Sequence, residues 1–223
     1  MPCARRSSSR LPAEDLETAP LAPAGLREAA RLLGRAFRDN PLNVAVLGGR
    51  SPHGRERANV AGMRALLPTA LAHGEVWVAR EGGVLRAVLV ATPPFGHPLP
   101  APSLPAQLRA VWVQGPAAAG RWREVFERLT ALHPREPHST LGVLGVDPGH
   151  QGRGIGGALL ERWLAVREAA GVGRGSGVYL ETDREENLRF YARRGFARAG
   201  ELELFGARVW RLWREPRGVP SGR

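Results

Sequence analysis

Apolar residues recur at helical spacing early in the chain and then change to strand-like alternation. Residues 25–38 place four apolar side chains on one helix face: Leu26, Ala30, Leu33 and Phe37. Residues 56–72 repeat this pattern. Apolar and polar residues alternate at 75–80, and the apolar segment 84–92 follows Gly82-Gly83, which together are typical of an antiparallel hairpin. The first half is therefore predicted to run helix, helix, strand, strand.

A proline-rich segment interrupts this order. Residues 93–105 contain six prolines, and each one fixes φ and removes a backbone donor, so the segment is predicted to be a loop. We interpret it as a passive connection, with a mobile lid as the alternative. One or two helices are expected between 104 and 132, with an interruption near Gly115-Pro116.

The last third of the chain has the clearest pattern. Residues 140–146 and 178–182 are predicted strands, and the helical periodicity of 154–170 lies between them, so together they form a βαβ unit. Further elements are expected after it, namely a short helix at 186–194 and strands at 197–204 and 207–214. The whole pattern predicts a mixed α/β fold.

Length and composition favour one domain. A chain of 223 residues with 43% hydrophobic residues can bury one full core, and too few residues would remain for a second independent domain. We expect a single domain over 21–215, with disordered tails at 1–20 and 216–223.

The net charge of +11 raises the question of nucleic acid. The chain has no lysine, and its 32 cationic residues are all arginines spread over predicted helices, loops and tails. Because nucleic-acid sites gather their cations, no nucleic-acid partner is expected. A small polyanion attracted by the general field fits the charge better.

Cysteine and hydropathy patterns exclude other classes. Cys3 is the single cysteine, so no internal disulfide can form, and no Cys/His spacing suggests a metal, so none is expected. No run approaches the roughly 18 apolar residues of a membrane span, and the N-terminus lacks the apolar core of a secretory signal. We expect a cytoplasmic protein without a membrane partner.

A glycine-rich loop joins the first strand of the βαβ unit to its helix. Residues 147–157 read DPGHQGRGIGG, and unpaired backbone N–H groups at the positive end of a helix form an anion site. Gly152, Gly154 and Gly156 would let phosphate oxygens approach the backbone, and Gln151 and Arg153 could add side-chain donors. The alternative is that the glycines only make a tight turn.

Gly152, Gly154 and Gly157 also satisfy the dinucleotide fingerprint G-x-G-x-x-G, with Glu181 ending the next strand. Two observations oppose this Rossmann interpretation. Five residues, 147–151, separate the strand from the first glycine, whereas the fingerprint normally follows its strand directly. Only about 40 residues follow Glu181, too few to complete the second half of such a site.

The runs VLGVDPGHQGRGIGGALL and VYLETDREENLRFYARRGF resemble the GNAT (GCN5-related N-acetyltransferase) superfamily, including its Q/R-x-x-G-x-G/A signature at Gln151, Gly154 and Gly156. The resemblance implies an α/β (α+β) fold, with helices on both faces of a mixed, mostly antiparallel sheet. That sheet would splay open between the strand at Leu144 and the strand at Leu180. The pantetheine arm of acetyl-CoA would pair with exposed backbone there.

The resemblance also implies the cofactor-binding residues: Leu144, Gly145, Val146, Gln151, Gly152, Arg153, Gly154, Ile155, Gly156 and Asn187. It places Tyr191 near the thioester sulfur as general acid. A thiol of pKa near 8.5 leaves more readily when protonated, and a phenol of pKa about 10 can supply the proton. Ordinary core packing is the alternative role for Tyr191.

The acceptor amine needs a base, because an alkylammonium of pKa near 10 is almost wholly protonated at pH 7. Glu181 is the first candidate and His138 the second. Each has a structural alternative, an ion pair or a solvated strand end for Glu181 and a strand cap for His138. A weakly basic amine would need no base, and the other histidines show no paired spacing and are interpreted as structural.

The resulting hypothesis is direct acetyl transfer in a ternary complex, from acetyl-CoA to a small-molecule or peptide amine. Cys3 lies in the expected tail, so an acyl-cysteine intermediate is not expected. Ser139 stands where an aromatic residue is common in this branch of the family, which leaves the acceptor open. The alternatives are O-acyl transfer, a GNAT-like module that binds acyl-CoA without turnover, and the Rossmann protein. A homodimer is compatible with the family.

Overall fold

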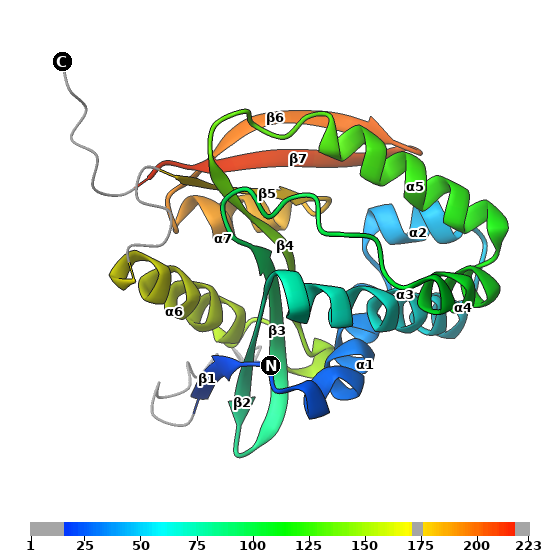
Figure 1. The fold of residues 1–223 in the computed structure, drawn as a ribbon, viewed down its shortest axis with the longest axis horizontal. Coiled ribbons are helices and arrows are strands. Elements are labelled where there is room, and N and C mark those ends of the chain that lie inside the picture. Colours follow the sequence, from blue (N-terminus) through cyan, green and yellow to red (C-terminus); the bar gives the residue numbers. More distant parts are fainter. Residues whose placement is uncertain (1–15, 171–175, 217–223) are drawn as a thin grey trace, which may run out of the picture.

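The computed structural model describes residues 16–170 and 176–216, which form one seven-stranded sheet (Figure 1). The strands lie in the order β1-β2-β3-β4-β5-β7-β6, and only β4 and β5 are parallel neighbours. Their bounds are β1 Leu16–Pro20, β2 Glu75–Glu81, β3 Val84–Thr92, β4 His138–Val146, β5 Gly177–Thr182, β6 Phe196–Leu204 and β7 Ala207–Arg214. The predicted mixed, mostly antiparallel sheet is confirmed, and the doubly wound parallel sheet of a Rossmann protein is excluded.

Helices cover both faces of this sheet, as predicted (Figure 1). The α-helices are α1 Leu26–Ala36, α2 Pro41–Leu47, α3 Pro52–His73, α4 Leu104–Gln114, α5 Pro116–Thr130, α6 Ile155–Ala169 and α7 Glu186–Ala192. Two short 3-10 helices are η2 Pro23–Gly25 and η3 Pro148–His150. Among the described residues, no helix combines the length and hydrophobicity that a membrane crossing requires.

The side chains of β3 point alternately to the two faces of the sheet and so contribute to two separate layers of the core. Leu89 and Ala91 pack on α6, whereas Val88 and Val90 pack on α1 and α3. Because successive strand residues point to opposite faces, a strand buried on both sides reads as a continuous apolar run. This explains why 84–92 is so rich in apolar residues.

Two elements differ from the sequence-based prediction. Leu16–Pro20, which we placed in the disordered tail, forms the edge strand β1 and pairs antiparallel with β2, so the predicted domain boundary at 21 was five residues too late. An edge strand is held mainly by backbone hydrogen bonds to one neighbour, so its sequence shows little alternation of apolar and polar residues. The helix α2 was not predicted, because the seven residues from Pro41 to Leu47 are too few to display a helical period. Residues 1–15 and 217–223 lie outside the described residues.

The parallel strands β4 and β5 separate half-way along their length. They pair only from His138 and Gly177 to Leu141 and Leu180, while β4 continues to Val146 beside β3. Gly142 is an extra residue at this point, because Ala91 pairs with Leu141 and Val90 with Val143. We call the space beyond Leu141 and Leu180 the notch. The predicted splay is therefore present.

A buried polar contact ties α6 to the sheet. Glu75 at the start of β2 accepts hydrogen bonds from the Trp163 indole, at 2.7 Å, and from the Arg167 guanidinium. Arg167 also donates to Ser139 Oγ and is only 6% exposed. Burial lowers the pKa of Arg167, while Glu75 opposes this shift. The positive charge of the buried guanidinium is therefore compensated by the carboxylate of Glu75.

We predict that Glu75→Ala lowers the free energy of unfolding by about 3 kcal/mol, because it leaves a buried cation and an indole N–H without partners. Chemical denaturation measures this change. Glu127→Ala is the control, since it removes an exposed pair with Arg123 and should cost less than about 0.5 kcal/mol. Equal effects of the two substitutions would contradict the assigned role of Glu75.

Candidate functional site

The free edge of β4 forms one wall of the notch. From Val143 to Val146 the strand pairs with β3 on one side and has no pairing with β5 on the other. Gly145 lies against α1, where a Cβ atom would come 2.5 Å from Leu33 Cδ2. Glycine therefore lets α1 pack closely behind the strand while the backbone edge stays available to a ligand.

The glycine loop follows directly and ends at the N-terminus of α6. Gly152 and Gly154 have φ values of +78° and +89°, and a Cβ atom on either would face open space. Gly156 differs, because its Cβ would lie 2.9 Å from Val146 Cγ2, so this glycine packs α6 onto β4. The first N–H groups of a helix have no intrahelical partner and lie at its positive end. The loop therefore presents unpaired donors beside the notch.

Asp147 fixes the start of the loop. Its carboxylate accepts hydrogen bonds from Arg35 on α1 at 2.8 Å, from the Gly149 amide at 3.1 Å and from His150 at 3.3 Å. Burial favours the protonated carboxyl, but these donors outweigh it and hold the pKa of Asp147 below its usual value. The carboxylate therefore stays charged and anchors the loop to α1.

The two predicted side-chain donors of the loop already have intramolecular partners. Gln151 Nε2 donates to the Val146 carbonyl at 3.2 Å, and Arg153 forms an ion pair with Glu81 on β2 at 3.1 Å. Gln151 therefore stabilises the strand-to-loop bend. A guanidinium has five N–H donors, so Arg153 can hold Glu81 and still offer donors to an anion.

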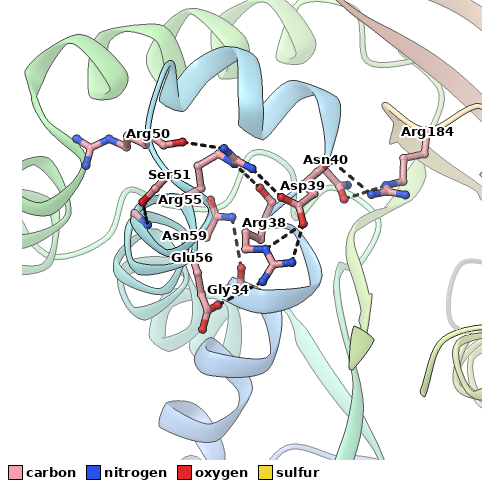
Figure 2. Close-up of polar contacts among 11 residues, drawn as sticks. Gly34, Arg38, Asp39, Asn40, Arg50, Ser51, Arg55, Glu56, Asn59 and Arg184 are labelled. Atoms are coloured by element: carbon pink, nitrogen blue, oxygen red, sulfur yellow. Dashed lines mark hydrogen bonds and ion pairs between the residues drawn. The ribbon is translucent and has the colours of Figure 1, made fainter. Parts of the chain in front are cut away.

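The predicted cofactor residue Asn187 lies at the start of α7, where its amide donates to Thr182 Oγ1 at 3.0 Å. The turn between β5 and α7 is held from the other side by the α1–α2 connection. Asn40 accepts a hydrogen bond from Arg184 of this turn at 3.0 Å (Figure 2). It also donates to Asp183 at 3.1 Å. The end of β5 is therefore fixed relative to α1, although the two are far apart in sequence.

Asp39 extends this network into α3. Its carboxylate accepts from Arg55 at 2.7 Å and from Arg38 at 2.9 Å, and these hydrogen bonds lower its pKa (Figure 2). Arg55 also donates to the carbonyls of Arg38 and Arg50, so it links the α1–α2 connection with the segment before α3. The α1–α2 connection is thus braced on both sides, by α3 and by the β5–α7 turn.

Tyr191 lies on α7 and is almost fully buried, at 7% exposure. Its ring packs edge-on against Phe190 and Phe196, with centroid distances of 5.0 and 5.6 Å. Burial raises the pKa of the phenol, which keeps it protonated at neutral pH. Packing and proton donation are therefore compatible for this side chain.

The structure connects the two candidate bases through a third residue. Glu181 Oε1 lies 3.5 Å from His133 Nε2, and His133 Nδ1 lies 3.1 Å from His138 Nε2. His138 in turn reaches the Glu136 carbonyl through Nδ1 at 2.8 Å. Glu181 and His138, which sequence reasoning treated as alternatives, thus belong to one chain of contacts, and Tyr191 lies in a separate cluster with α6.

Sequence reasoning missed His133 and His97. Their rings stack at a centroid distance of 3.6 Å with an interplanar angle of 5°. His97 comes from the proline-rich segment after β3, so this segment covers part of the site. No local spacing could reveal a contact between residues 36 positions apart; the one available signal was that His133 and His138 flank the start of β4.

Residues 118–198 match the family profile "Acetyltransferase (GNAT) domain". This range contains β4, the glycine loop, α6, β5 and Tyr191, which are the elements of the notch. Residues 118–198 therefore carry a GNAT acetyltransferase domain. The predicted family resemblance is confirmed.

Two curated proteins share the GNAT region at sequence level. The chain is 48% identical over 71 residues to mycothiol acetyltransferase of Beutenbergia cavernae, covering 30% of this chain and 24% of that protein. It is 48% identical over 60 residues to the N-alpha-acetyltransferase RimI of Mycobacterium tuberculosis, covering 26% of this chain and 34% of that protein. The chain therefore spans 24% and 34% of the length of these two relatives.

Solved structures extend the likeness in fold to the whole domain. A histone acetyltransferase HPA2-related acetyltransferase from Corynebacterium glutamicum superposes with a TM-score of 0.69 at 21% identity, covering 93% of this chain and 99% of that one. The PaiA N-acetyltransferase of Thermoplasma acidophilum, solved with coenzyme A, gives a TM-score of 0.57 at 12% identity, with coverages of 90% and 98%. At these identities the likeness shows the fold alone.

We predict that His97 makes the stability of this protein sensitive to acid. Burial and the nearby His133 lower the pKa of His97 from 6.5 to about 4, so the unfolded chain binds a proton at a higher pH than the folded one. Stability should therefore fall as the pH drops from about 6.5 to about 4.

His97→Phe keeps a ring for stacking and should flatten this part of the curve of unfolding free energy against pH. His73→Phe, at an exposed position, is the control and should leave the wild-type slope. Parallel curves for wild type and His97→Phe would show that His97 is not buried in its neutral form.

Proposed function

We propose that this protein transfers the acetyl group of acetyl-CoA directly to an amine. The observation that carries the proposal is the notch, where a free strand edge at Gly142–Val146 continues into unpaired N–H groups at the start of α6. Coenzyme A combines an amide-bearing pantetheine arm with a pyrophosphate. The free strand edge suits the arm, and the helix N-terminus suits the pyrophosphate.

The cofactor-binding residues would act mostly through their backbone. Leu144, Gly145 and Val146 offer the strand edge to the pantetheine amides, and the segment from Gln151 to Gly156 offers N–H groups to the pyrophosphate. Arg153 adds positive charge near the phosphates, and the Asn187 amide would contact the arm from α7. The PaiA structure with coenzyme A supports this assignment, because its fold is the same.

Tyr191 would protonate the sulfur as the tetrahedral intermediate collapses. A thiolate is a poorer leaving group than a thiol, and positioned proton donors typically contribute 10²–10⁴-fold to rate. The raised pKa of the buried phenol keeps the proton available until the sulfur gains negative charge. A backbone N–H in Leu144–Val146 would stabilise the developing charge on the carbonyl oxygen.

Glu181 would begin deprotonation of the acceptor. It is the residue that follows Leu180, the last β5 residue paired with β4, so it stands where the two strands separate. The curated relatives are named mycothiol acetyltransferase and N-alpha-acetyltransferase RimI, and the second name supports an amine acceptor. The absence of a cysteine among residues 16–223 supports direct transfer.

Calorimetric titration with acetyl-CoA, with NADPH in parallel, tests the cofactor assignment. Micromolar affinity for acetyl-CoA alone is expected. Release of free thiol is then followed with a panel of amines, including agmatine and peptides with free α-amines. Binding without release of thiol for any amine would instead indicate an acyl-CoA binding module without turnover, and absence of binding would refute the proposal.

We predict that Gly154→Glu weakens acetyl-CoA binding at least tenfold. The new residue must adopt φ near +89°, and its carboxylate would face the pyrophosphate. Gly206→Glu is the matched control, because it places the same side chain at φ near +80° in the open β6–β7 turn. The proposed phosphate site would be wrong if the two variants bound acetyl-CoA with equal affinity.

We predict that Tyr191→Phe lowers kcat by 10²-fold or more and leaves the affinity for acetyl-CoA unchanged, because only the transferable proton is removed. The ring and its contacts with Phe190 and Phe196 remain. Steady-state kinetics with a saturating acceptor measures the change. Full turnover by the variant would assign Tyr191 to packing alone.

A further inference from the structure

Five side chains from four separate segments meet on the face of β5 that carries Glu181. We call this group the histidine cluster; it consists of His97, His133, His138, Tyr179 and Glu181. His133 is its centre, stacked on His97 at 3.6 Å and packed against the Tyr179 ring at 4.5 Å. Its two ring nitrogens face Glu181 and His138.

Buried polar atoms without hydrogen bonds concentrate at this cluster. In the described part of the chain seven side-chain atoms are of this kind, and six lie in the cluster or on strand residues beside it. They are Thr92 Oγ1, His97 Nε2, Thr140 Oγ1, Tyr179 Oη, Glu181 Oε1 and Arg211 Nε. Tyr179 also interacts with Glu181 and Arg211. The polar groups of the cluster therefore face one another in the interior, where an unpaired polar atom is costly.

The contact distances define how protons are arranged along the chain of contacts. The Glu136 carbonyl can only accept, so His138 Nδ1 carries a proton and, in the neutral ring, Nε2 is an acceptor. His133 Nδ1 must then donate to it, which leaves His133 Nε2 as a lone pair facing the Glu181 carboxylate. With both rings neutral, two contacts hold a proton and the third does not.

The third contact is also the longest. The first two span 2.8 and 3.1 Å, whereas His133 Nε2 and Glu181 Oε1 are 3.5 Å apart. One additional proton would bridge this last pair and complete the chain. It would convert the two rings into one shared imidazolium that is balanced by the carboxylate.

We propose that His133 and His138, together with Glu181, act as one proton acceptor for the incoming amine. The inference rests on the proposed acetyl transfer and adds the route of the proton. An alkylammonium loses two protons on becoming an amide. The first passes to Glu181 and His133 and returns to solvent after the product leaves, and the second replaces the proton that Tyr191 gives to the coenzyme A sulfur.

The surroundings of His133 fit this role. The ionisable groups packed around it are His97, His138, Tyr179, Glu181 and Arg211, whose guanidinium donates to the Leu132 carbonyl. Burial lowers the pKa of His97 to about 4, so this ring stays neutral at pH 7 and does not compete for the proton. Its ring covers His133 and limits contact with water.

Nitrogen-15 NMR of the imidazoles tests the proton arrangement without an acceptor. Both His133 and His138 should be in the Nδ1–H form when the two rings are neutral, and one added proton should change the nitrogen signals of both rings together. Glu181→Gln removes the carboxylate that balances the shared imidazolium and should abolish this joint change, while the signals of the exposed His53 stay as in wild type. Protonation of one ring without the other, or no effect of Glu181→Gln, would overturn the proposal.

Kinetics tests the catalytic role. His133→Gln should lower kcat at pH 7 by 10- to 100-fold with an alkylamine, and its rate should keep rising to pH 9 and above, because only neutral amine from solution reacts. An arylamine, which is neutral at pH 7, should react equally with both enzymes. His53→Gln is the control, and acetyl-CoA affinity verifies that each variant is folded.

The outcomes separate this inference from the proposed function. If wild type acetylates amines and His133→Gln shows the same rate and pH profile, the proton route is wrong and acetyl transfer stands. If wild type binds acetyl-CoA and acetylates no amine, the proposed function fails, and the catalytic role of His133 fails with it.

Discussion

The separation of β4 from β5 after only four paired residues organises the rest of this protein. A parallel pair inside a sheet normally satisfies its backbone donors and acceptors along its full length. Here the extra residue Gly142 marks the point of divergence, and the next residues keep β3 as their only strand neighbour. One strand edge is thereby left without a neighbouring strand in the middle of the sheet, and helices cover both faces of the sheet around it.

Several contacts maintain this open geometry. Arg35 and Asp147 fix the glycine loop to α1 on one side, and Asn40, Asp183 and Arg184 fix the end of β5 on the other. Glu75 and Arg167 hold α6 to the outer part of the sheet. The walls of the notch are therefore held by side-chain contacts to helices, which suits a site whose recognition of its ligand depends on the backbone.

Sequence patterns predicted most of the fold because its signals are local. The apolar run of β3, the helical periodicity of α6 and the glycine loop can each be recognised within about 15 residues of sequence. The family signature at Gln151, Gly154 and Gly156 then indicated how these elements are arranged in one fold. The edge strand Leu16–Pro20 and the short helix α2 lack such a pattern. The site was predicted only in part, because Glu181 and His138 could be named singly, while the stacking of His97 on His133 depends on a loop that returns from β3.

Hydrogen–deuterium exchange with and without acetyl-CoA tests the central claim, that the cofactor occupies the notch. Saturating acetyl-CoA should slow exchange in peptides covering residues 142–157, which include the free edge of β4 and the glycine loop, and should leave the β6–β7 hairpin unchanged. Unchanged exchange at 142–157 under saturating acetyl-CoA, or protection confined to the hairpin, would contradict the account.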